Sequence, residues 1–349
     1  MFSNGKSLFK YATSGGCAAK IPAGTLREVL GKVQPPTRSE LIRGPQDFED
    51  AAAYRLPDGN ILLSTVDFIP PVVDDPHTYG KIAAANALSD IYAMGGDPIL
   101  ALNLVCFPVA DLPLDMLRAM VEGLNEKTAE AGAALGGGHS VNDKELKLGL
   151  SVNGLCKESR LLTNNALREG DVLILLKRPG CGPVNTGIRK GVATEIEERT
   201  AVLNMQLLNR LPQGTREKFT ISSCTDVTGF GLIGHASEMA RASKVHVELD
   251  LQNITLLPGA LRLMEKGVCT KAADNNFTYA SDILELKQGT KKDDPKFRVI
   301  CDAETSGGLL LGVPEAQNHA FREFIMPFGF EDAATVGVVR SKGTAKLSV

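Results

Sequence analysis

The sequence predicts an α/β protein of two domains, each with a mixed sheet covered by helices. Three observations support this fold class. The chain has 349 residues, more than one ordinary hydrophobic core organises. Short apolar segments typical of strands alternate with longer amphipathic segments typical of helices. The composition, 43% apolar and 23% charged, is that of a globular protein.

The first 24 residues are rich in Gly, Ser and Ala and show no apolar period, so we expect a mobile glycine-rich segment over 1–24. A short helix is predicted over 25–33, followed by a proline-containing loop over 34–49. The segment carries no long apolar stretch, so we do not read it as a secretory signal.

The predicted N-terminal domain spans 25–157. Its strands are expected at 61–68, 98–107 and 146–155. A helix of small residues is predicted over 80–94 and ends at Gly95 and Gly96, which can adopt the left-handed conformation. A second, amphipathic helix carries its apolar stripe on Leu114, Leu117, Met120, Val121 and Leu124, with Asp111 as the expected N-cap.

The predicted C-terminal domain spans 158–349, with the boundary between 157 and 170. We expect strands at 172–177, 245–251, 307–313 and 333–340, and helices at 196–211, 229–243 and 314–327. No short repeat and no low-complexity segment interrupts this order.

The net charge and the placement of the cysteines exclude several classes of function. The net charge of −3 provides no basic field for nucleic acid or an anionic membrane. No apolar segment reaches the roughly 20 residues of a membrane helix. The seven cysteines are scattered and form no CxxC pair, which argues against a disulfide framework and a zinc site. We therefore expect a cytoplasmic protein.

Cys17 and Lys20 lie in the glycine-rich sequence GGCAAK. We expect this cysteine to be exposed, and a lysine three residues away favours the thiolate. Lys20 could instead meet a phosphate as a point charge. The alternative is a chance cysteine in a loose terminus beside a solvated lysine.

Four aspartates are candidates for metal or phosphate chemistry: Asp50, Asp67, Asp90 and Asp226. Asp67 ends a predicted strand, and Asp90 shares one face of a small-residue helix with Asn86. Carboxylates at strand ends and helix mouths suit Mg²⁺, which prefers oxygen ligands and shares substrate phosphates. Each aspartate alone could equally be a cap, a turn residue or a solvated side chain.

Two glycine-rich sequences could bind phosphate. Gly138, His139 and Ser140 follow two further glycines and could line an anion nest, or simply form a tight hairpin or the start of a strand. Residues 229–234 match G-x-G-x-x-G, but the polar, turn-like residues before them argue against a dinucleotide site. The sequence has neither a Walker A motif nor a kinase catalytic loop.

Taken together, the motifs resemble the selenophosphate synthetase (selenide, water dikinase) family, within the aminoimidazole ribonucleotide synthetase-like ATP-binding proteins. The resemblance is collinear over about residues 9–340. The matching sequences are GGCAAKI (15–21), EDAAAY (49–54), STVDF (64–68), ANALSDIYAMGGDP (85–98), GGHS (137–140), TDVTGFGLIGH (225–235) and CDAETSGGLLLGV (301–313).

The resemblance implies the two-domain aminoimidazole ribonucleotide synthetase-like fold and a role for each site residue. Cys17 matches the catalytic cysteine or selenocysteine, and Lys20 the essential lysine. The magnesium-ligand positions are Asp50, Asp90 and Asp226. The nucleotide-contacting positions are Lys20, Asp47, Phe48, Glu49, Asp67 and Asp90, with Gly138, His139 and Ser140 reaching the nucleotide from the partner subunit of a homodimer.

The implied reaction converts ATP, selenide and water to selenophosphate, AMP and phosphate, with Mg²⁺. The chain departs from the family pattern at Ala19, where many relatives have a second cysteine, at Phe48 and Glu49, and at Glu304, commonly glutamine. Two other classes of protein remain as alternatives: an ATP-binding relative such as a thiamine-monophosphate kinase or a carbamoyl-dehydrating maturation protein, and a thiol carrier without ATP chemistry.

Overall fold

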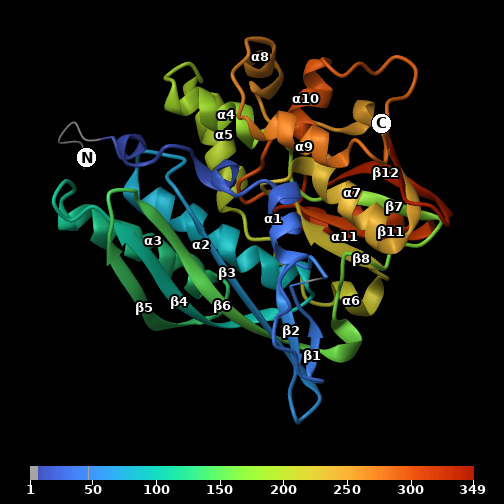
Figure 1. The fold of residues 1–349 in the computed structure, drawn as a ribbon, viewed down its shortest axis with the longest axis horizontal. Helices are drawn as coiled ribbons and strands as arrows, with labels where there is room; N and C mark the ends of the chain where they lie inside the picture. The colour runs from blue at the N-terminus through green and yellow to red at the C-terminus, as the bar shows by residue number, and fades with distance from the viewer. Residues whose placement is uncertain (1–6, 46) are drawn as a thin grey trace.

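The computed structural model describes residues 7–45 and 47–349. Two sheets form the framework, and Figure 1 shows them side by side with helices packed on both. This arrangement confirms the predicted fold class. Among the described residues, no helix has the length and apolar character needed to cross a membrane.

The N-terminal sheet has six strands in the order β1-β2-β3-β6-β4-β5. Its elements are β1 (Leu41–Arg43), β2 (Ala52–Arg55), β3 (Asn60–Ile69), α2 (Pro76–Ala93), β4 (Asp97–Phe107), α3 (Leu114–Glu130), β5 (Ala134–Asn142) and β6 (Lys147–Lys157). The two helices pack on one face, where alternate residues of β3, among them Leu63 and Asp67, are buried. The intervening residues Val66 and Phe68 are exposed on the other face.

Local capping explains where the two helices begin and end. Asp75 caps α2 by accepting a hydrogen bond from the Thr78 amide at 2.8 Å, so this helix starts four residues before the predicted position. Gly95 follows with φ +76°, the predicted left-handed stop. The expectation that Asp111 caps α3 is wrong, because Pro113 occupies the N-cap position and the helix starts at Leu114.

The C-terminal sheet has seven strands in the order β10-β13-β9-β12-β7-β11-β8. These strands are β7 (Asp171–Leu175), β8 (Ser223–Asp226), β9 (Val245–Leu249), β10 (Leu284–Glu285), β11 (Leu309–Pro314), β12 (Ala334–Lys342) and β13 (Lys346–Ser348). The helices are α4 (Cys181–Arg189), α5 (Glu195–Gln206), α6 (Thr215–Lys218), α7 (Gly231–Ser243), α8 (Ala260–Glu265), α9 (Ala272–Ala280), α10 (Pro295–Cys301) and α11 (Asn318–Ile325).

The helices cover both faces of the C-terminal sheet. α7, α9 and α10 form one apolar core with the strands, and α11 packs against the opposite face. α4 and α5 join the N-terminal core instead, with Val184 and Met205 in the same cluster as Leu88 of α2. The helix α2 therefore lies at the centre of the molecule and contacts both domains.

One local expectation is wrong and a second is decided by the structure. Thr225 and Asp226, the first of the polar residues expected to form a turn before Gly229, lie in the buried strand β8. Of the alternatives for the glycine cluster at 136–138, a strand fits and a tight hairpin does not, because these residues lie inside the exposed strand β5. The helices α4, α8, α9 and α10 were not predicted. The domain boundary stays a prediction, and β6 ends at Lys157 while β7 begins at Asp171.

The described part of the N-terminal segment is packed against the rest of the chain. It forms two short 3-10 turns, Leu8–Tyr11 and Gly16–Ala19, before α1 (Ala23–Leu30). Leu8 is 0% exposed and Cys17 is 1% exposed. The first six residues of the predicted mobile segment lie outside the described residues. Opening and closing of this segment stays a prediction.

Candidate active site

A chain of hydrogen bonds joins the N-terminal segment to α2 and β3. The Cys17 thiol donates to Asn86 Oδ1 at 3.2 Å, and Asn86 Nδ2 donates to Asp67 Oδ2 at 2.6 Å. Lys20 Nζ lies 2.9 Å from the same carboxylate oxygen. The two residues predicted as catalytic thus converge on one buried aspartate, with Asn86 between them.

The C-terminal domain also holds Cys17 in place. The Cys17 amide donates to Thr305 Oγ1 at 3.2 Å, and the Ser306 amide donates to Asn86 Oδ1 at 2.9 Å. Gly16 adopts φ +55°, and a Cβ there would lie 2.2 Å from Thr305 Oγ1, so the close approach requires glycine. No role for Thr305 or Ser306 follows from the sequence alone, although both lie in the motif CDAETSGG.

Burial sets the protonation state of Cys17. It raises the pKa of the thiol to about 12, because the favourable charge of Lys20 offsets only part of the lost hydration. The hydrogen bond from the thiol to Asn86 fits the neutral form. The expectation of an exposed cysteine that favours the thiolate is therefore wrong for this conformation, because the segment is folded over the site and Lys20 pairs with Asp67.

This burial predicts slow alkylation. With iodoacetamide at pH 8, Cys17 should react at least about tenfold more slowly than the half-buried Cys106, because only the accessible thiolate reacts. Peptide mass spectrometry over time measures both rates in one sample. Equal rates would show that the segment carrying Cys17 is open most of the time.

Three aspartates form a second group beside this series of hydrogen bonds: Asp50 before β2, Asp90 in α2 and Asp226 at the end of β8. Thr225 Oγ1 donates to Asp50 Oδ1 at 2.9 Å, and Thr65 Oγ1 donates to Asp90 Oδ2 at 2.5 Å. Burial raises the pKa of all three carboxyl groups, and the charge of Asp226 further raises the pKa values of Asp50 and Asp90.

One carboxylate oxygen each of Asp50 and Asp226 indicates that a cation is missing from this group. Both Oδ2 atoms are buried and have no hydrogen-bond partner. A buried carboxylate oxygen without a partner is costly, and a cation would satisfy it and relieve the mutual repulsion. The donor set, oxygen only, fits Mg²⁺.

The arrangement also limits how a metal would be held. In residues 7–45 and 47–349, no three His, Cys, Asp or Glu side chains are arranged so that together they could hold a metal ion. Magnesium commonly takes one or two carboxylates and completes its shell with water and substrate phosphates. Asp50, Asp90 and Asp226 fit that mode, and their role as ligands stays a prediction.

The raised pKa values predict a stability profile. Because the folded state binds these protons more tightly than the unfolded chain, the metal-free protein should lose stability as pH rises above about 4. Mg²⁺ should therefore raise the melting temperature by several degrees at pH 8 and by much less at pH 5. Scanning fluorimetry with and without MgCl₂ measures this, and an equal shift at both pH values would contradict it.

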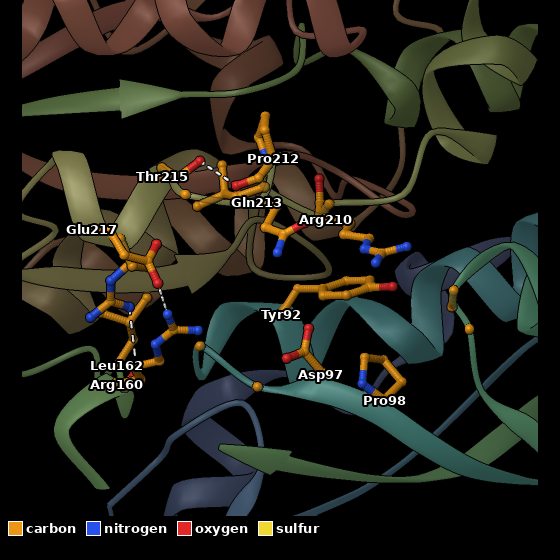
Figure 2. Close-up of a pocket in the computed structure, with 18 residues that line it drawn as sticks. Tyr92, Asp97, Pro98, Arg160, Leu162, Arg210, Pro212, Gln213, Thr215 and Glu217 are labelled. Carbon is orange, nitrogen blue, oxygen red and sulfur yellow. Dashed lines mark hydrogen bonds and ion pairs between the residues drawn. The ribbon is translucent and has the colours of Figure 1, made fainter. Parts of the chain in front are cut away.

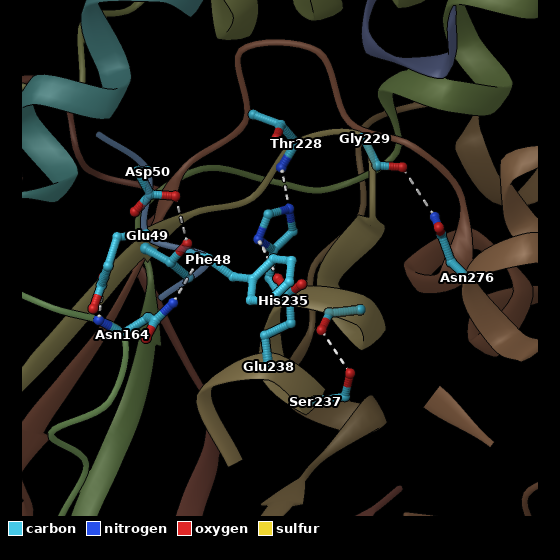
Figure 3. Close-up of polar contacts among 12 residues, drawn as sticks. Phe48, Glu49, Asp50, Asn164, Thr228, Gly229, His235, Ser237, Glu238 and Asn276 are labelled. Carbon is cyan, nitrogen blue, oxygen red and sulfur yellow. Dashed lines mark hydrogen bonds and ion pairs between the residues drawn. The ribbon is translucent and has the colours of Figure 1, made fainter. Parts of the chain in front are cut away.

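Residues 47–49 brace the loop that presents Asp50. The Glu49 carboxylate accepts from the Asn164 amide at 2.9 Å, and the Phe48 carbonyl accepts from Asn164 Nδ2 at 2.8 Å, as Figure 3 shows. Asp47 accepts from the Gly44 amide at 2.7 Å. Burial raises the pKa of Glu49 to about 7. These contacts give the three residues a positioning role, and nucleotide contact by them stays a prediction.

Gly138, His139 and Ser140 do not join the other site residues within this chain. They lie in β5, the outer edge of the sheet, separated from β3 by β6 and β4, and all three are exposed. β5 pairs with β4 in parallel, and the register shifts between Ala101 and Asn103 opposite the glycines. Their predicted contact with a nucleotide therefore depends on a partner subunit.

Glu304, the late departure from the family pattern, supports α4. Its carboxylate accepts from the Gly180 and Cys181 amides at 2.7 and 2.9 Å at the start of that helix. This position favours a negatively charged or hydrogen-bonding oxygen. Burial opposes the charge and raises the pKa of Glu304 to about 8.

The G-x-G-x-x-G sequence serves the Cys17 segment and not a dinucleotide. β8 precedes it, but this strand pairs with β11 in antiparallel fashion, unlike the parallel unit of a Rossmann site. A Cβ at Gly229 would lie 2.9 Å from the Cys17 carbonyl oxygen. His235 Nε2 accepts from the Thr228 amide at 3.1 Å and fixes this turn (Figure 3).

Comparison with known proteins first defines the class. The AIR synthase related N-terminal domain matches residues 48–156, and the AIR synthase related C-terminal domain matches residues 168–349. Thiamine monophosphate kinase from Aquifex aeolicus has a TM-score of 0.62 at 18% identity, covering 93% of this chain and 94% of that one. HypE in a HypE–HypF complex has a TM-score of 0.65 at 16% identity, covering 91% of this chain and 93% of that one. The chain is a two-domain AIR synthase related protein.

Sequence relatives define the family. The chain is 40% identical to a selenide, water dikinase from Clostridium botulinum over 96% of both chains. It is 41% identical to one from Myxococcus xanthus, over 96% of this chain and 95% of the relative, and 37% identical to one from Clostridioides difficile, over 99% and 98%. The chain therefore belongs to the selenide, water dikinase (selenophosphate synthetase) family, whose members are phosphotransferases.

Proposed function

We propose that this protein makes selenophosphate, AMP and phosphate from ATP, selenide and water. One observation carries the proposal: Cys17 is joined to Asp67 through Asn86, and Lys20 pairs with Asp67 directly, beside three aspartates that leave two buried oxygens unpaired. This arrangement supports the proposal, in which a soft sulfur group and a cation act next to carboxylates suited to a metal-bound polyphosphate.

Each side chain has a distinct part in this proposal. Asp50, Asp90 and Asp226 would hold Mg²⁺, which neutralises polyphosphate charge when bound. Lys20, oriented by Asp67, stabilises negative charge on the transferring phosphoryl group. Cys17 meets selenium, a soft element matched to sulfur. Residues 7–24, folded over the site, keep water from the nucleophile.

The reaction products distinguish this function from that of the kinase relatives. Purified protein with ATP and Mg²⁺ should form AMP in proportion to added selenide, measured by chromatography of nucleotides under anaerobic conditions. Selenide-independent ADP as the sole product would favour a kinase instead. Absence of any ATP turnover would favour a thiol carrier.

We further propose a homodimer. The outer face of the N-terminal sheet carries apolar side chains that the described residues leave exposed, with Val66, Phe68, Ile99 and Leu100 between 36% and 59% exposed. A contiguous exposed apolar face of this kind is typical of an interface. β5 lies at its edge, so a partner on this face would meet Gly138, His139 and Ser140.

A charged substitution tests this interface. Phe68→Lys should convert the dimer to a monomer, because a buried unpaired ammonium is costly. The matched control is Leu203→Lys, an exposed apolar residue on α5 in the other domain. Light scattering after size-exclusion chromatography measures the mass. A parent protein that is monomeric at all concentrations would contradict the proposal.

We also propose a cytoplasmic location. All seven cysteines are free in the structure, as expected in a reducing compartment.

A further inference from the structure

A second cavity lies apart from the proposed active site. It has a volume of about 490 Å³ and opens where the end of α2 and the start of β4 face residues 209–217 of the C-terminal domain (Figure 2). Cys17, Lys20, Asp67 and the three proposed magnesium ligands are not among its lining residues. Its size is within the range of sites for small organic ligands.

The cavity carries more positive than negative side chains. Arg160 pairs with Glu217, and Arg216 Nη1 donates to the Arg160 carbonyl at 3.2 Å. Arg210 has no hydrogen bond or ion pair in the part of the chain that the structure describes. Asp97 lies below the Tyr92 ring in Figure 2, whereas Arg210 lies above it. Three guanidinium groups face two carboxylates, and Arg210 is available to an anion.

Two buried polar atoms at this cavity lack partners. The Tyr92 hydroxyl and Asn209 Oδ1 are inaccessible to solvent and accept or donate no hydrogen bond among the described residues. Tyr92 is 6% exposed and Asn209 1% exposed. Figure 2 shows the Tyr92 ring below Arg210, with the Tyr92 hydroxyl and the Arg210 guanidinium group pointing to the same side of the view. Unsatisfied buried polar atoms lining a cavity indicate a missing ligand or water.

The polar groups of the cavity indicate the chemistry of that ligand. Arg210 and Arg216 would bind an oxyanion, and the Tyr92 hydroxyl can donate a hydrogen bond to the same oxyanion. Asn209 Oδ1 accepts only, and Asp97 also accepts, so the ligand needs O–H or N–H donors as well. Inorganic phosphate alone is too small for the volume, whereas a phosphorylated sugar or nucleoside fills it.

We propose that this cavity binds a phosphate monoester that carries hydroxyl or amino donors, such as a nucleoside monophosphate. The site is connected to the proposed active site through the side chains of Asn209 and Ser89. Asn209 Nδ2 donates to Ser89 Oγ at 2.8 Å, and Ser89 directly precedes Asp90, a proposed magnesium ligand, in α2. A ligand that engages Asn209 Oδ1 therefore acts on a side chain that is bonded to the neighbour of that aspartate.

Calorimetric titration of the full chain with AMP tests the proposal. The choice of AMP rests on the proposed function, in which it is a product, but binding itself requires no turnover. Arg210→Ala and Tyr92→Phe should each weaken one AMP-binding step by about tenfold to a hundredfold, since each removes a hydrogen bond to a charged group. The control Arg199→Ala, an exposed arginine on α5, should leave the isotherm unchanged.

Further experiments test whether AMP binds at this cavity or at the proposed active site, and which part of AMP is recognised. Lys20→Ala, which removes a cation from the proposed active site, should leave this step in place. Ribose 5-phosphate should compete with AMP, whereas adenosine should not. AMP binding unaffected by both cavity variants would overturn the proposal, as would equal affinity for adenosine and AMP. Failure of the selenide assay alone would leave this binding result standing.

Discussion

Replacing Cys17 by alanine should abolish selenide-dependent AMP formation while leaving ATP binding within about threefold of the parent, a difference below about 0.7 kcal/mol. The thiol bonds Asn86 and touches none of the three magnesium-ligand candidates through a hydrogen bond. Its removal therefore takes away the sulfur without changing the carboxylates. Initial-rate assays with selenide and equilibrium titration with ATP measure the two effects separately.

The matched control for this variant is Cys106→Ala, a half-buried cysteine in β4 that should keep full activity. Because Cys17 lies in the core, Cys17→Ser provides a second variant that preserves volume and the hydrogen bond to Asn86. Selenide-dependent activity retained in both Cys17 variants would remove this residue from the mechanism.

Replacing Asp226 by asparagine should have opposite effects on activity and on stability. Turnover of ATP should fall by at least about a hundredfold, because one proposed magnesium-binding carboxylate is lost. The metal-free protein at pH 8 should nevertheless become more stable, on the order of 1 kcal/mol, since a buried charge that repels Asp50 and Asp90 is removed. Denaturant unfolding and an ATPase assay on the same preparation measure both.

Asp171→Asn is the contrasting control. Asp171 is also buried, but its carboxylate accepts hydrogen bonds from the Ser222 hydroxyl and the Arg168 amide, so this variant should lose stability and keep its activity per folded molecule. If Asp226→Asn destabilised the metal-free protein as Asp171→Asn does, Asp226 would be a structural residue and the magnesium assignment would fail.

The regular parts of the fold were predictable because their signals are local. The strand β3 shows alternating apolar residues, and α2 ends at a glycine that can adopt positive φ. The helices α8, α9 and α10 have only six to nine residues, too few for a clear period. β8 is not evident from the sequence because three of its four residues are polar, and they are buried by pairing with β11, a contact distant in sequence.

The sequence predicted which residues belong to the site, but it did not predict how they are arranged or buried. Cys17, Lys20 and the aspartates were selected from their motifs, but the burial of Cys17 depends on Thr305, 288 residues away. The same holds for Asp50, which is held by Thr225 at a separation of 175 residues. Because burial and not sequence neighbourhood determines the pKa of the thiol, local reasoning gave the wrong protonation state.

The most direct test of the central claim is a phosphorus NMR spectrum of the complete reaction, with ATP, Mg²⁺ and selenide under anaerobic conditions. We expect a new phosphorus signal coupled to selenium, appearing together with equal amounts of AMP and inorganic phosphate. A spectrum showing ADP and no phosphorus–selenium coupling, from protein that binds ATP, would contradict the claim that this site transfers phosphate to selenium.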